Sequence, residues 1–327
     1  MRFIVGVDIG GTNIVVGTVS EDGASVHGVS THATRPEEGA PAVIARIGAQ
    51  VEESVRATLR ETGLGRDSVV GVGIGAPGPL DRARGLVLLT PNLGWRELPL
   101  RDLVSDQVHM PATLDNDANC AVYGEWWVGA ARGARYVVGL TIGTGIGGGI
   151  VIDGRLYHGT SDIAGEIGHT TIDSTGRRCK CGNYGCLEAY ASGPAIAARA
   201  VEGIEAGADS TLPTFVGGDL SQVTAQTVYE AAHAGDDYAQ EVVRETARLL
   251  GAGVANLVNI FNPDVVVIAG GVTLAGDRLF VPLREEVKRR AFKPAVERCR
   301  VVPGLLPGTA GVLGAAATFK VQTWGQA

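Results

Sequence analysis

The feature of this sequence that most constrains its fold is a strand–turn–strand pattern that occurs twice. Residues 4–12 align with residues 137–145, and the same offset continues without a gap through residues 15–19 and 148–152. Apolar positions match on both sides of a glycine turn in each copy. A register that persists over this length indicates two homologous halves, each opening with a strand, a glycine-rich turn and a second strand.

The order of the remaining predicted elements places the chain in the α/β class. Apolar side chains recur at helical spacing over residues 41–62, and further helices are predicted at 118–131, 238–261 and 308–319. Strands are predicted at 69–74, 112–115 and 265–268. Alternation of strands and helices favours α/β over α+β, and 327 residues suit two domains. We expect a smaller domain of residues 1–116, joined by a C-terminal helix returning at about 306–327, and a larger domain of residues 117–305.

Charge and hydropathy argue against several classes of partner. The formal net charge of −7 disfavours broad nucleic-acid binding, which needs a basic face. No apolar run approaches the roughly 20 residues of a membrane span, so we expect no membrane contact. The first residues enter a strand pattern without the features of a signal peptide, so a cytoplasmic location is expected.

Three glycine turns follow predicted strands and are suited to binding phosphate groups: Gly10-Gly11-Thr12, Gly143-Thr144-Gly145 and Gly270-Gly271. Glycine permits backbone conformations in which N–H groups point at an anion, although a single such turn is more often a plain hairpin turn. The duplication of two turns, with Asp8 ahead of the first, favours a nucleotide. None is a P-loop, because no Gly-Lys-Ser/Thr follows, and a strand rather than a helix follows the first turn, which disagrees with a Rossmann fingerprint.

The polar residues after strand 112–115 suit phosphoryl transfer to an alcohol. This chemistry needs a group that accepts the hydroxyl proton, and Asp117, near a helix N-terminus, is favoured in the ionised form that a base requires. The alternative is that Asn116 or Asp117 only caps the helix. Strand alternation makes Asp115 the weaker candidate for the base. Amide, carboxylate and imidazole groups that suit paired sugar hydroxyls are also present, although each alone is more often a surface residue: Asn92, Asn116, Glu166, His169 and Glu188.

Three of the five cysteines crowd into the segment from Cys179 through Cys181 to Cys186, shortly after His169. Three thiolates and one imidazole form a set suited to tetrahedral zinc. A disulfide and free structural cysteines are the alternatives, but Cys179 and Cys181 are too close in sequence for an easy bond. We predict a structural zinc loop over residues 169–188 that holds His169 and Glu188 toward one cavity.

The phosphate turns also carry a resemblance. The segments at residues 8–13, 141–145 and 269–271 resemble the two phosphate loops and the adenosine loop of actin-like ATPases and sugar kinases. The resemblance implies an actin-like (ribonuclease-H-like) fold of two duplicated domains with an active-site cleft between them. It further implies that Asp8 holds Mg²⁺ through water and that the ATP contacts are Gly10, Gly11, Thr12, Asn13, Thr141, Gly143, Thr144, Gly145, Gly270 and Gly271.

The motifs of the acceptor side resemble one family in particular. The Glu166-x-Gly168-His169 motif, the cysteine segment with Glu188, and residues 114–119 together resemble the ROK family (repressors, unassigned reading frames, kinases). Residues 90–95 resemble its glucose-phosphorylating members. The resemblance implies ATP-dependent phosphorylation of the 6-hydroxyl of glucose, with Asp117 as the base. It implies hexose contacts from Asn92, Asn116, Asp117, Glu166, His169 and Glu188, and from Gly78 through its backbone.

Three alternatives remain open at this stage. A ROK kinase for N-acetylmannosamine, fructose or allose shares nearly all these motifs. A sugar-sensing transcriptional regulator of the family carries a helix-turn-helix segment before the kinase-like part, and here the first strand begins at about Phe3. Polyphosphate is a possible donor that glycine turns do not distinguish from ATP. By analogy with the family, a homodimer or homotetramer is expected.

Overall fold

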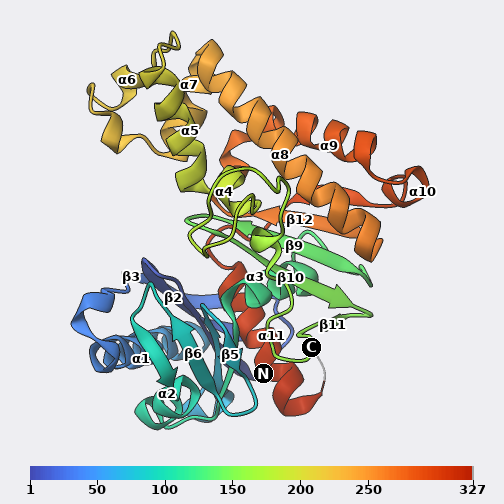
Figure 1. Ribbon diagram of the computed structural model, residues 1–327. Coiled ribbons are helices and arrows are strands. Elements are labelled where there is room, and N and C mark those ends of the chain that lie inside the picture. The colour runs from blue at the N-terminus through green and yellow to red at the C-terminus, as the bar shows by residue number, and fades with distance from the viewer. Residues whose placement is uncertain (326–327) are drawn as a thin grey trace. The chain divides into compact units, whose positions relative to one another are not determined.

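The structure is a computed structural model that describes residues 1–325, and it has two compact units (Figure 1). Unit 1 comprises residues 1–134, 149–165 and the C-terminal segment from Leu305. Unit 2 comprises residues 135–148 and 166–304. The chain passes from unit 2 back to unit 1 within strand β10 (Ile146–Ile152).

Unit 1 is built on a five-stranded sheet in the order β3-β2-β1-β4-β8. Strand β1 pairs antiparallel with β2 and parallel with β4, and β4 pairs parallel with β8. The predicted opening hairpin is therefore confirmed. The five strands are β1 (Phe3–Ile9), β2 (Asn13–Ser20), β3 (Val26–Ala33), β4 (Val69–Ala76) and β8 (Ala112–Asn116).

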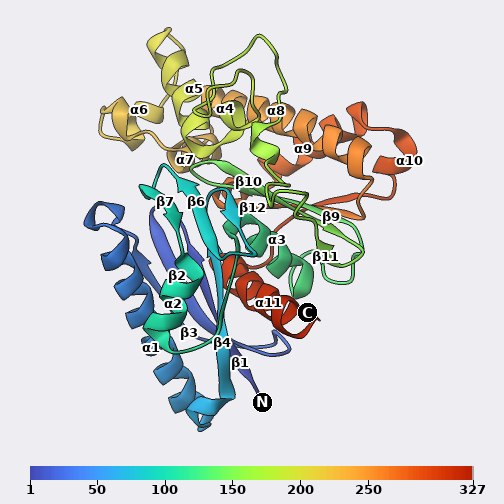
Figure 2. The same ribbon diagram turned by 60° about the horizontal axis from the view of Figure 1, so that its bottom comes forward.

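Side chains of β1 are buried on both faces of this sheet. Phe3, Val5, Val7 and Ile9 belong to a core shared with α1 (Ala40–Thr62) and α2 (Leu100–Val108), whereas Ile4 packs with residues of α11 (Ala310–Trp324). Figure 2 shows α1 and α2 on one side of the sheet and α3 (Asp117–Trp127) with α11 on the other. Successive side chains of a strand point to opposite faces of the sheet. A sheet with helices on both faces therefore needs strands that are apolar on both faces, as found here.

The C-terminal helix α11 lies unusually close to the sheet of unit 1. A side chain at Gly73 would place its Cβ only 1.8 Å from the carbonyl oxygen of Ala315. Glycine at this position therefore lets α11 lie directly on β4. A separate three-stranded sheet in the same unit consists of β5 (Leu80–Asp81), β6 (Leu86–Thr90) and β7 (Trp95–Leu98).

The second five-stranded sheet repeats the order of the first. Its order is β11-β10-β9-β12-β13, with β9 parallel to β12 and β12 parallel to β13. Each strand thus has a counterpart at the same place in the first sheet, which confirms the duplication predicted from the sequence. The bounds, besides those of β10, are β9 (Val137–Ile142), β11 (Arg155–Leu156), β12 (Val265–Ala269) and β13 (Arg300–Pro303).

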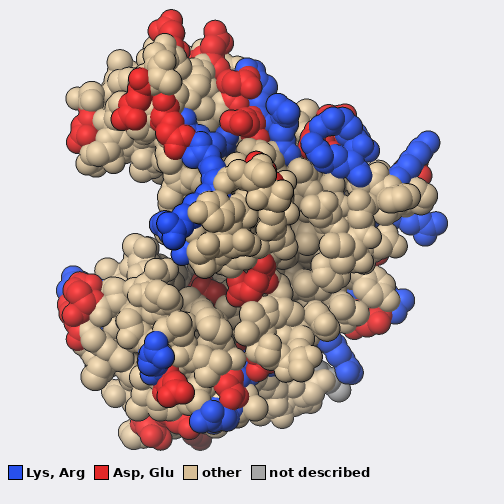
Figure 3. Space-filling view, in the orientation of Figure 1, with Lys and Arg blue, Asp and Glu red and all other residues tan. Residues whose placement is uncertain are grey.

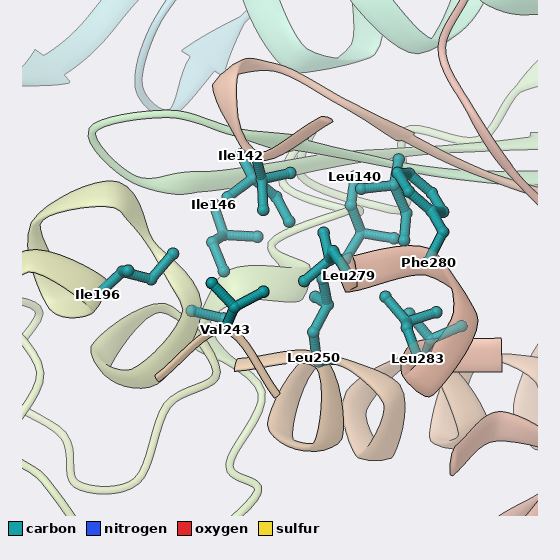
Figure 4. Packing of buried hydrophobic residues seen from close by; sticks show 14 of the residues in the cluster. Leu140, Ile142, Ile146, Ile196, Val243, Leu250, Leu279, Phe280 and Leu283 are labelled. Carbon is teal, nitrogen blue, oxygen red and sulfur yellow. The ribbon is translucent and has the colours of Figure 1, made fainter. Parts of the chain in front are cut away.

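The core of unit 2 lies between strand β9 and a layer of helices. Figure 4 shows Leu140 and Ile142 of β9 facing Leu250 of α8 and Leu283 of α9, with Ile196 of α5 beside them. All of these side chains are buried, so α8 and α9 are anchored to the sheet by their apolar faces. The helices of this unit are α4 (Glu188–Ala191), α5 (Gly193–Glu205), α6 (Leu212–Phe215), α7 (Ala225–Ala234), α8 (Asp237–Phe261), α9 (Asp277–Arg290) and α10 (Lys293–Val296).

The compact units divide the chain differently from the predicted domains at two places. Helix α3 belongs to unit 1, where it packs on α11, although the predicted boundary lay after Asn116. Residues 149–165 also belong to unit 1. Both differences arise from tertiary packing, which strand and helix patterns in the sequence do not encode.

Charged side chains are distributed unevenly over unit 2. Figure 3 shows acidic residues over α5–α7 and basic residues over α9 and α10. The basic residues of the last turn of α9 are ion-paired, Lys288 with Glu285 and both Arg289 and Arg290 with Glu286. Their charge is therefore largely compensated within the helix. Of the helices in residues 1–325, none has the length and apolar character to cross a membrane.

Candidate active site

The register of the first sheet aligns the chemically important residues of unit 1. Asp8 of β1 lies opposite Gly75 of β4, and Gly75 lies opposite Asp115 of β8. These strands are parallel, so their carboxyl ends meet at one edge of the sheet, where ligands of open α/β sheets bind. Asp117 follows at the start of α3, and the Cβ position of Gly75 is 3.4 Å from its Cα.

The carboxyl group of Asp8 is deeply desolvated. Burial, followed by the nearby charge of Asp117, raises its pKa from 3.8 to about 7. The first turn of α11 lies against it, since a Cβ at Gly311 would be 2.1 Å from Asp8 Oδ2. Two carboxylates whose negative charges repel one another favour a bound cation between or beside them. The chemistry of this pair therefore fits the predicted magnesium site.

Asn116 and Asp117 form the junction between β8 and α3. Asn116 is the N-cap residue, and its Oδ1 accepts hydrogen bonds from the backbone N–H groups of Ala118 at 3.0 Å and Asn119 at 3.1 Å. Asp117 Oδ1 accepts from Ala118 N at 2.8 Å. Capping, which the sequence left as the alternative, is thus real for Asn116. It fixes the side chain of Asn116 and leaves Asp117 in the first helical turn, where an ionised carboxylate is favoured.

Two other predicted contacts of unit 1, Asn92 and Gly78, lie in different surroundings. The Cβ position of Gly11 is 3.8 Å from Cβ of Asn92, so a predicted phosphate turn and a predicted hexose residue are neighbours. Gly78 has φ of 95°, and any Cβ there would be 2.4 Å from the carbonyl oxygen of Leu89. Only glycine fits without strain at this position. In the first turn, Gly11, Thr12 and Asn13 are exposed.

The two glycine turns of unit 2 line one cavity of about 430 Å³. Gly143 and Thr144 form one wall and Gly271 another, and the first turn of α5 closes a third side. The N–H of Gly193, the first residue of α5, donates to the carbonyl oxygen of Gly143 at 2.8 Å. A helix N-terminus beside a glycine turn favours an anion, and the mainly apolar lining suits a flat base.

The backbone conformation at position 270, next to this cavity, requires a glycine. Its φ is 92°, and a Cβ would lie 2.3 Å from the carbonyl oxygen of Ile142. Thr141 lies opposite Ala269 in the sheet, so the second and third glycine turns leave adjacent strand ends. The structure therefore brings together the predicted nucleotide residues that belong to unit 2.

The predicted zinc ligands form one compact group. The ligand atoms of His169, Cys179, Cys181 and Cys186 all lie within 4.8 Å of one another. Cys179 Sγ is 3.7 Å from His169 Nδ1, and Cys181 Sγ is 3.7 Å from Cys186 Sγ. Zinc bonds of about 2.3 Å to sulfur and about 2.0 Å to nitrogen place neighbouring tetrahedral ligands roughly 3.6–3.8 Å apart. The donor set and its spacing thus fit a zinc ion.

The disulfide alternative disagrees with the geometry of this group. All five cysteines are free thiols, and the 3.7 Å between Cys181 and Cys186 far exceeds the roughly 2.05 Å of a disulfide bond. Burial raises the pKa of the Cys186 thiol to about 12 and also raises that of Cys179. Both thiols would stay protonated at neutral pH without a cation, so metal binding must release protons.

Two of the predicted hexose residues of unit 2 lie close to the Cys₃His group or its first member. Cys179 Sγ is 3.8 Å from Glu188 Oε1, while Glu188 Oε2 accepts from the backbone N–H of Ile146 at 2.9 Å. The backbone N–H of His169 donates to the carbonyl oxygen of Glu166 at 3.1 Å. Glu166 thus adjoins His169 through the backbone, and Glu188 adjoins the cysteines, while their joint role in binding a hexose stays a prediction.

Comparison with known proteins identifies the family. The sequence profile of the ROK family matches residues 4–322. The chain belongs to the ROK family. It is 40% identical over 323 residues to a glucokinase of Thermotoga maritima, covering 98% of each chain. The predicted α/β, actin-like duplicated sugar kinase fold is confirmed by a solved ROK family glucokinase from Streptomyces griseus in complex with glucose and AMPPNP, with a TM-score of 0.83, 36% identity, and coverage of 96% of this chain and 98% of that one.

The regulator branch of the family is also represented among the relatives of this ROK protein. A xylose repressor of Caldicellulosiruptor bescii is 36% identical over 246 residues, which cover 75% of this chain and 61% of the repressor. The glucokinases match over nearly their whole length, whereas a large part of the repressor has no counterpart here.

Sequence reasoning missed two parts of the site. The walls that α5 and α7 contribute to the cavity, including Pro194, Ala225 and Tyr229, carry no motif. The partners of the buried Asp115, Arg82 and His158, are far from it in sequence. A lone histidine or arginine gives no signal of pairing before the fold is known.

Proposed function

We propose that this ROK protein transfers the γ-phosphoryl group of ATP to the 6-hydroxyl of glucose, giving glucose 6-phosphate and ADP. The observation that carries the proposal is Asp117, placed at the head of α3 beside the buried Asp8, in a chain that matches glucokinases over 98% of its length. Hexose contacts are assigned to Gly78, Asn92, Asn116, Glu166, His169 and Glu188, whose positions in each unit are compatible with this role.

In this mechanism Asp117 accepts the proton of the 6-hydroxyl while that oxygen bonds to the γ-phosphorus. The bond from the γ-phosphorus to the bridging oxygen of ATP breaks, and ADP leaves with that oxygen. Catalysis comes mainly from holding the hydroxyl and the phosphorus in line. The capped junction at Asn116 supports this, because the N-cap hydrogen bonds fix the backbone that carries Asp117.

Asp8 would hold Mg²⁺, which neutralises charge on the transferring phosphoryl group when bound. The glycine turns at Gly10–Asn13 and Gly143–Gly145 would bind the phosphates, and the cavity beside Gly270 and Gly271 would take the nucleoside. The Cys₃His group would hold a structural zinc, because all four of its positions are filled by protein ligands. We further propose a cytoplasmic homodimer or homotetramer.

ATP is favoured over polyphosphate by the cavity of unit 2. Its volume of about 430 Å³ and its mainly apolar lining suit a nucleoside. Polyphosphate has no apolar group that would fill such a cavity. Other hexoses remain the alternative acceptors, because the same polar groups bind several sugars. A purely regulatory role is disfavoured by the intact set of Asp8, Asp117 and glycine turns.

The test is ADP release with ATP and Mg²⁺ across glucose, mannose, fructose, N-acetylglucosamine and N-acetylmannosamine, with a blank that lacks sugar. Fast turnover with glucose alone supports the proposal. Preference for another sugar keeps the kinase and discards glucose as the substrate. No turnover with any sugar, from zinc-replete protein, contradicts the enzyme assignment.

A further inference from the structure

A buried cluster of charges lies directly beside the junction that carries Asp117. We define the Arg82 cluster as Arg82, Asp115, His158 and Asp162, all of unit 1. Asp115 is completely buried, with Arg82 Nε 3.0 Å from its Oδ2 and His158 Nε2 3.0 Å from the same oxygen. An isolated carboxylate at such a site would be strongly disfavoured, so these two partners determine whether the charge is tolerated.

Amide groups complete the surroundings of Asp115. Its Oδ1 accepts from the backbone N–H of Asn116 at 2.9 Å and lies 3.4 Å from Asn119 Nδ2. Gln322 Nε2 of α11 is 3.5 Å from Oδ2. With its oxygens occupied in this way, Asp115 is anchored in the protein rather than directed at a ligand.

Arg82 extends the cluster to a second acidic residue. It lies in the turn between β5 and β6, and its backbone N–H donates to Asp162 Oδ2 at 3.2 Å, with Nη1 3.5 Å from Oδ1. Asp162 has φ of 57°, a left-handed conformation that an aspartate adopts at a cost. The two contacts with Arg82 offset that cost and fix the loop at this point.

The three segments joined at Arg82 each carry or lead into a predicted hexose contact. The β5–β6 hairpin is flanked by Gly78 and Asn92, and Asp115 directly precedes Asn116 and Asp117. Asp162 lies in the loop that runs along the chain into Glu166. Neither the glycine turns of unit 2 nor the nucleoside cavity is part of the cluster.

We propose that Arg82 is a positioning residue for the sugar acceptor, which acts through Asp115 and Asp162 without touching the substrate itself. The proposal rests on the assigned kinase reaction. A displacement of about 1 Å at a reacting group can reduce the rate about 100-fold, so loosening these segments should weaken use of the sugar. It should leave use of ATP nearly unchanged.

Steady-state kinetics of Arg82→Ala test the proposal. We expect kcat/KM for glucose to fall about 100-fold with a clear rise in the KM for glucose, while the KM for ATP changes less than about twofold. Arg84→Ala is the matched control, because Arg84 lies in the same turn, its side chain is 71% exposed, and it forms a long ion pair of 3.7 Å with Asp81. It should match the wild type.

A second pair of variants guards against a folding defect in Arg82→Ala. Asp162→Asn keeps an oxygen acceptor and tolerates the left-handed backbone, so it should retain near wild-type KM for glucose, whereas Asp162→Ala should raise it about tenfold. If these residues had a purely structural role, Arg82→Ala and Asp162→Ala would lower the thermal stability. The KM for glucose and the KM for ATP would then change alike.

Three results would overturn the positioning role: an unchanged KM for glucose in folded Arg82→Ala, an equal rise in both KM values, or identical kinetics of Asp162→Asn and Asp162→Ala. Failure of the reaction assignment is recognised separately, because then the wild type itself does not turn over glucose. In that case, glucose affinity by calorimetry decides, and equal affinity of the wild type, Arg82→Ala and Asp162→Ala would still overturn the proposal.

Discussion

The two halves of this protein have sheets of the same topology, but the side chains at their strand ends differ in chemistry. Strands β1, β4 and β8 of the first sheet correspond in order and direction to β9, β12 and β13 of the second. At the equivalent strand ends, the first half has Asp8 where the second has Thr141. The first half also places Asp117 after β8, whereas residues 304–309 after β13 contain no acidic side chain.

The difference shows how a duplicated fold can divide one reaction. The first half concentrates negative charge, which suits a cation and a general base. The second half combines glycine turns, an apolar cavity and a Cys₃His group, which suit a nucleoside and the orientation of the proposed sugar-binding groups. The duplicated backbone determines where strand ends lie, and the side chains there determine what each end does.

The largest expected effect comes from Asp117, the proposed base of the first half. Asp117→Asn should reduce kcat about 10³-fold, because the amide cannot accept the proton of the hydroxyl. Thr141→Ala, at the position equivalent to Asp8 in the second half, should reduce kcat less than about tenfold. Stopped-time assays of ADP release measure both. Comparable losses in the two variants would contradict the division of chemistry between the halves.

The pH dependence of stability sharpens the comparison at Asp8. Since burial raises its pKa from 3.8 to about 7, its ionisation favours the unfolded chain. Its contribution to stability is complete below about pH 4 and is lost as the pH rises through about 7, by about 4 kcal/mol. Without Mg²⁺, the free energy of unfolding of the wild type should therefore fall by this amount relative to Asp8→Asn over that range.

Chemical denaturation at a series of pH values measures this difference, and subtraction of the Asp8→Asn curve removes the other titrating groups. Adding Mg²⁺ at pH 8 should restore part of the stability of the wild type alone. Parallel curves for the two proteins would show that burial does not raise the pKa of Asp8.

The backbone of the second half makes the next prediction. Gly270→Ala should lower the free energy of unfolding by about 2 kcal/mol, because φ is 92° and the new Cβ would meet the carbonyl oxygen of Ile142 at 2.3 Å. Gly271→Ala is the control, since within residues 1–325, its own chain neighbours aside, no heavy atom lies within 4 Å of its Cβ position. Thermal denaturation compares the two, and equal melting temperatures would contradict the required close approach.

The Cys₃His group of the second half makes the last prediction. Cys186→Ser should lower zinc content and raise the KM for glucose about tenfold, because His169 and Glu188 lose their common anchor. Cys299→Ser, which alters a half-buried cysteine outside the zinc group, should change neither. Metal analysis and steady-state kinetics measure both variants. Full zinc loss with an unchanged KM for glucose would separate the metal from sugar binding.

Much of the fold was predictable because its signals are local. Short-range apolar patterns predicted the hairpin of β1 and β2, the long helix α8 and the duplicated register. The structure confirms all three. Helix ends were less accurate: α3 ends at Trp127 instead of 131, and α11 runs from Ala310 to Trp324 instead of 308–319. Small residues fill α11, so its apolar pattern gives no clear limit.

By itself, the sequence identified the Cys₃His group, the glycine turns and the Asn116-Asp117 junction. In each case the residues that act together are close along the chain, so spacing and residue type carry the information. Only the tertiary structure decided the row from Asp8 to Asp115, the walls of the cavity in unit 2 and the Arg82 cluster. Those groups join segments that are distant in sequence, and their contacts exist only after burial removes water from the charges and brings the strand ends into register.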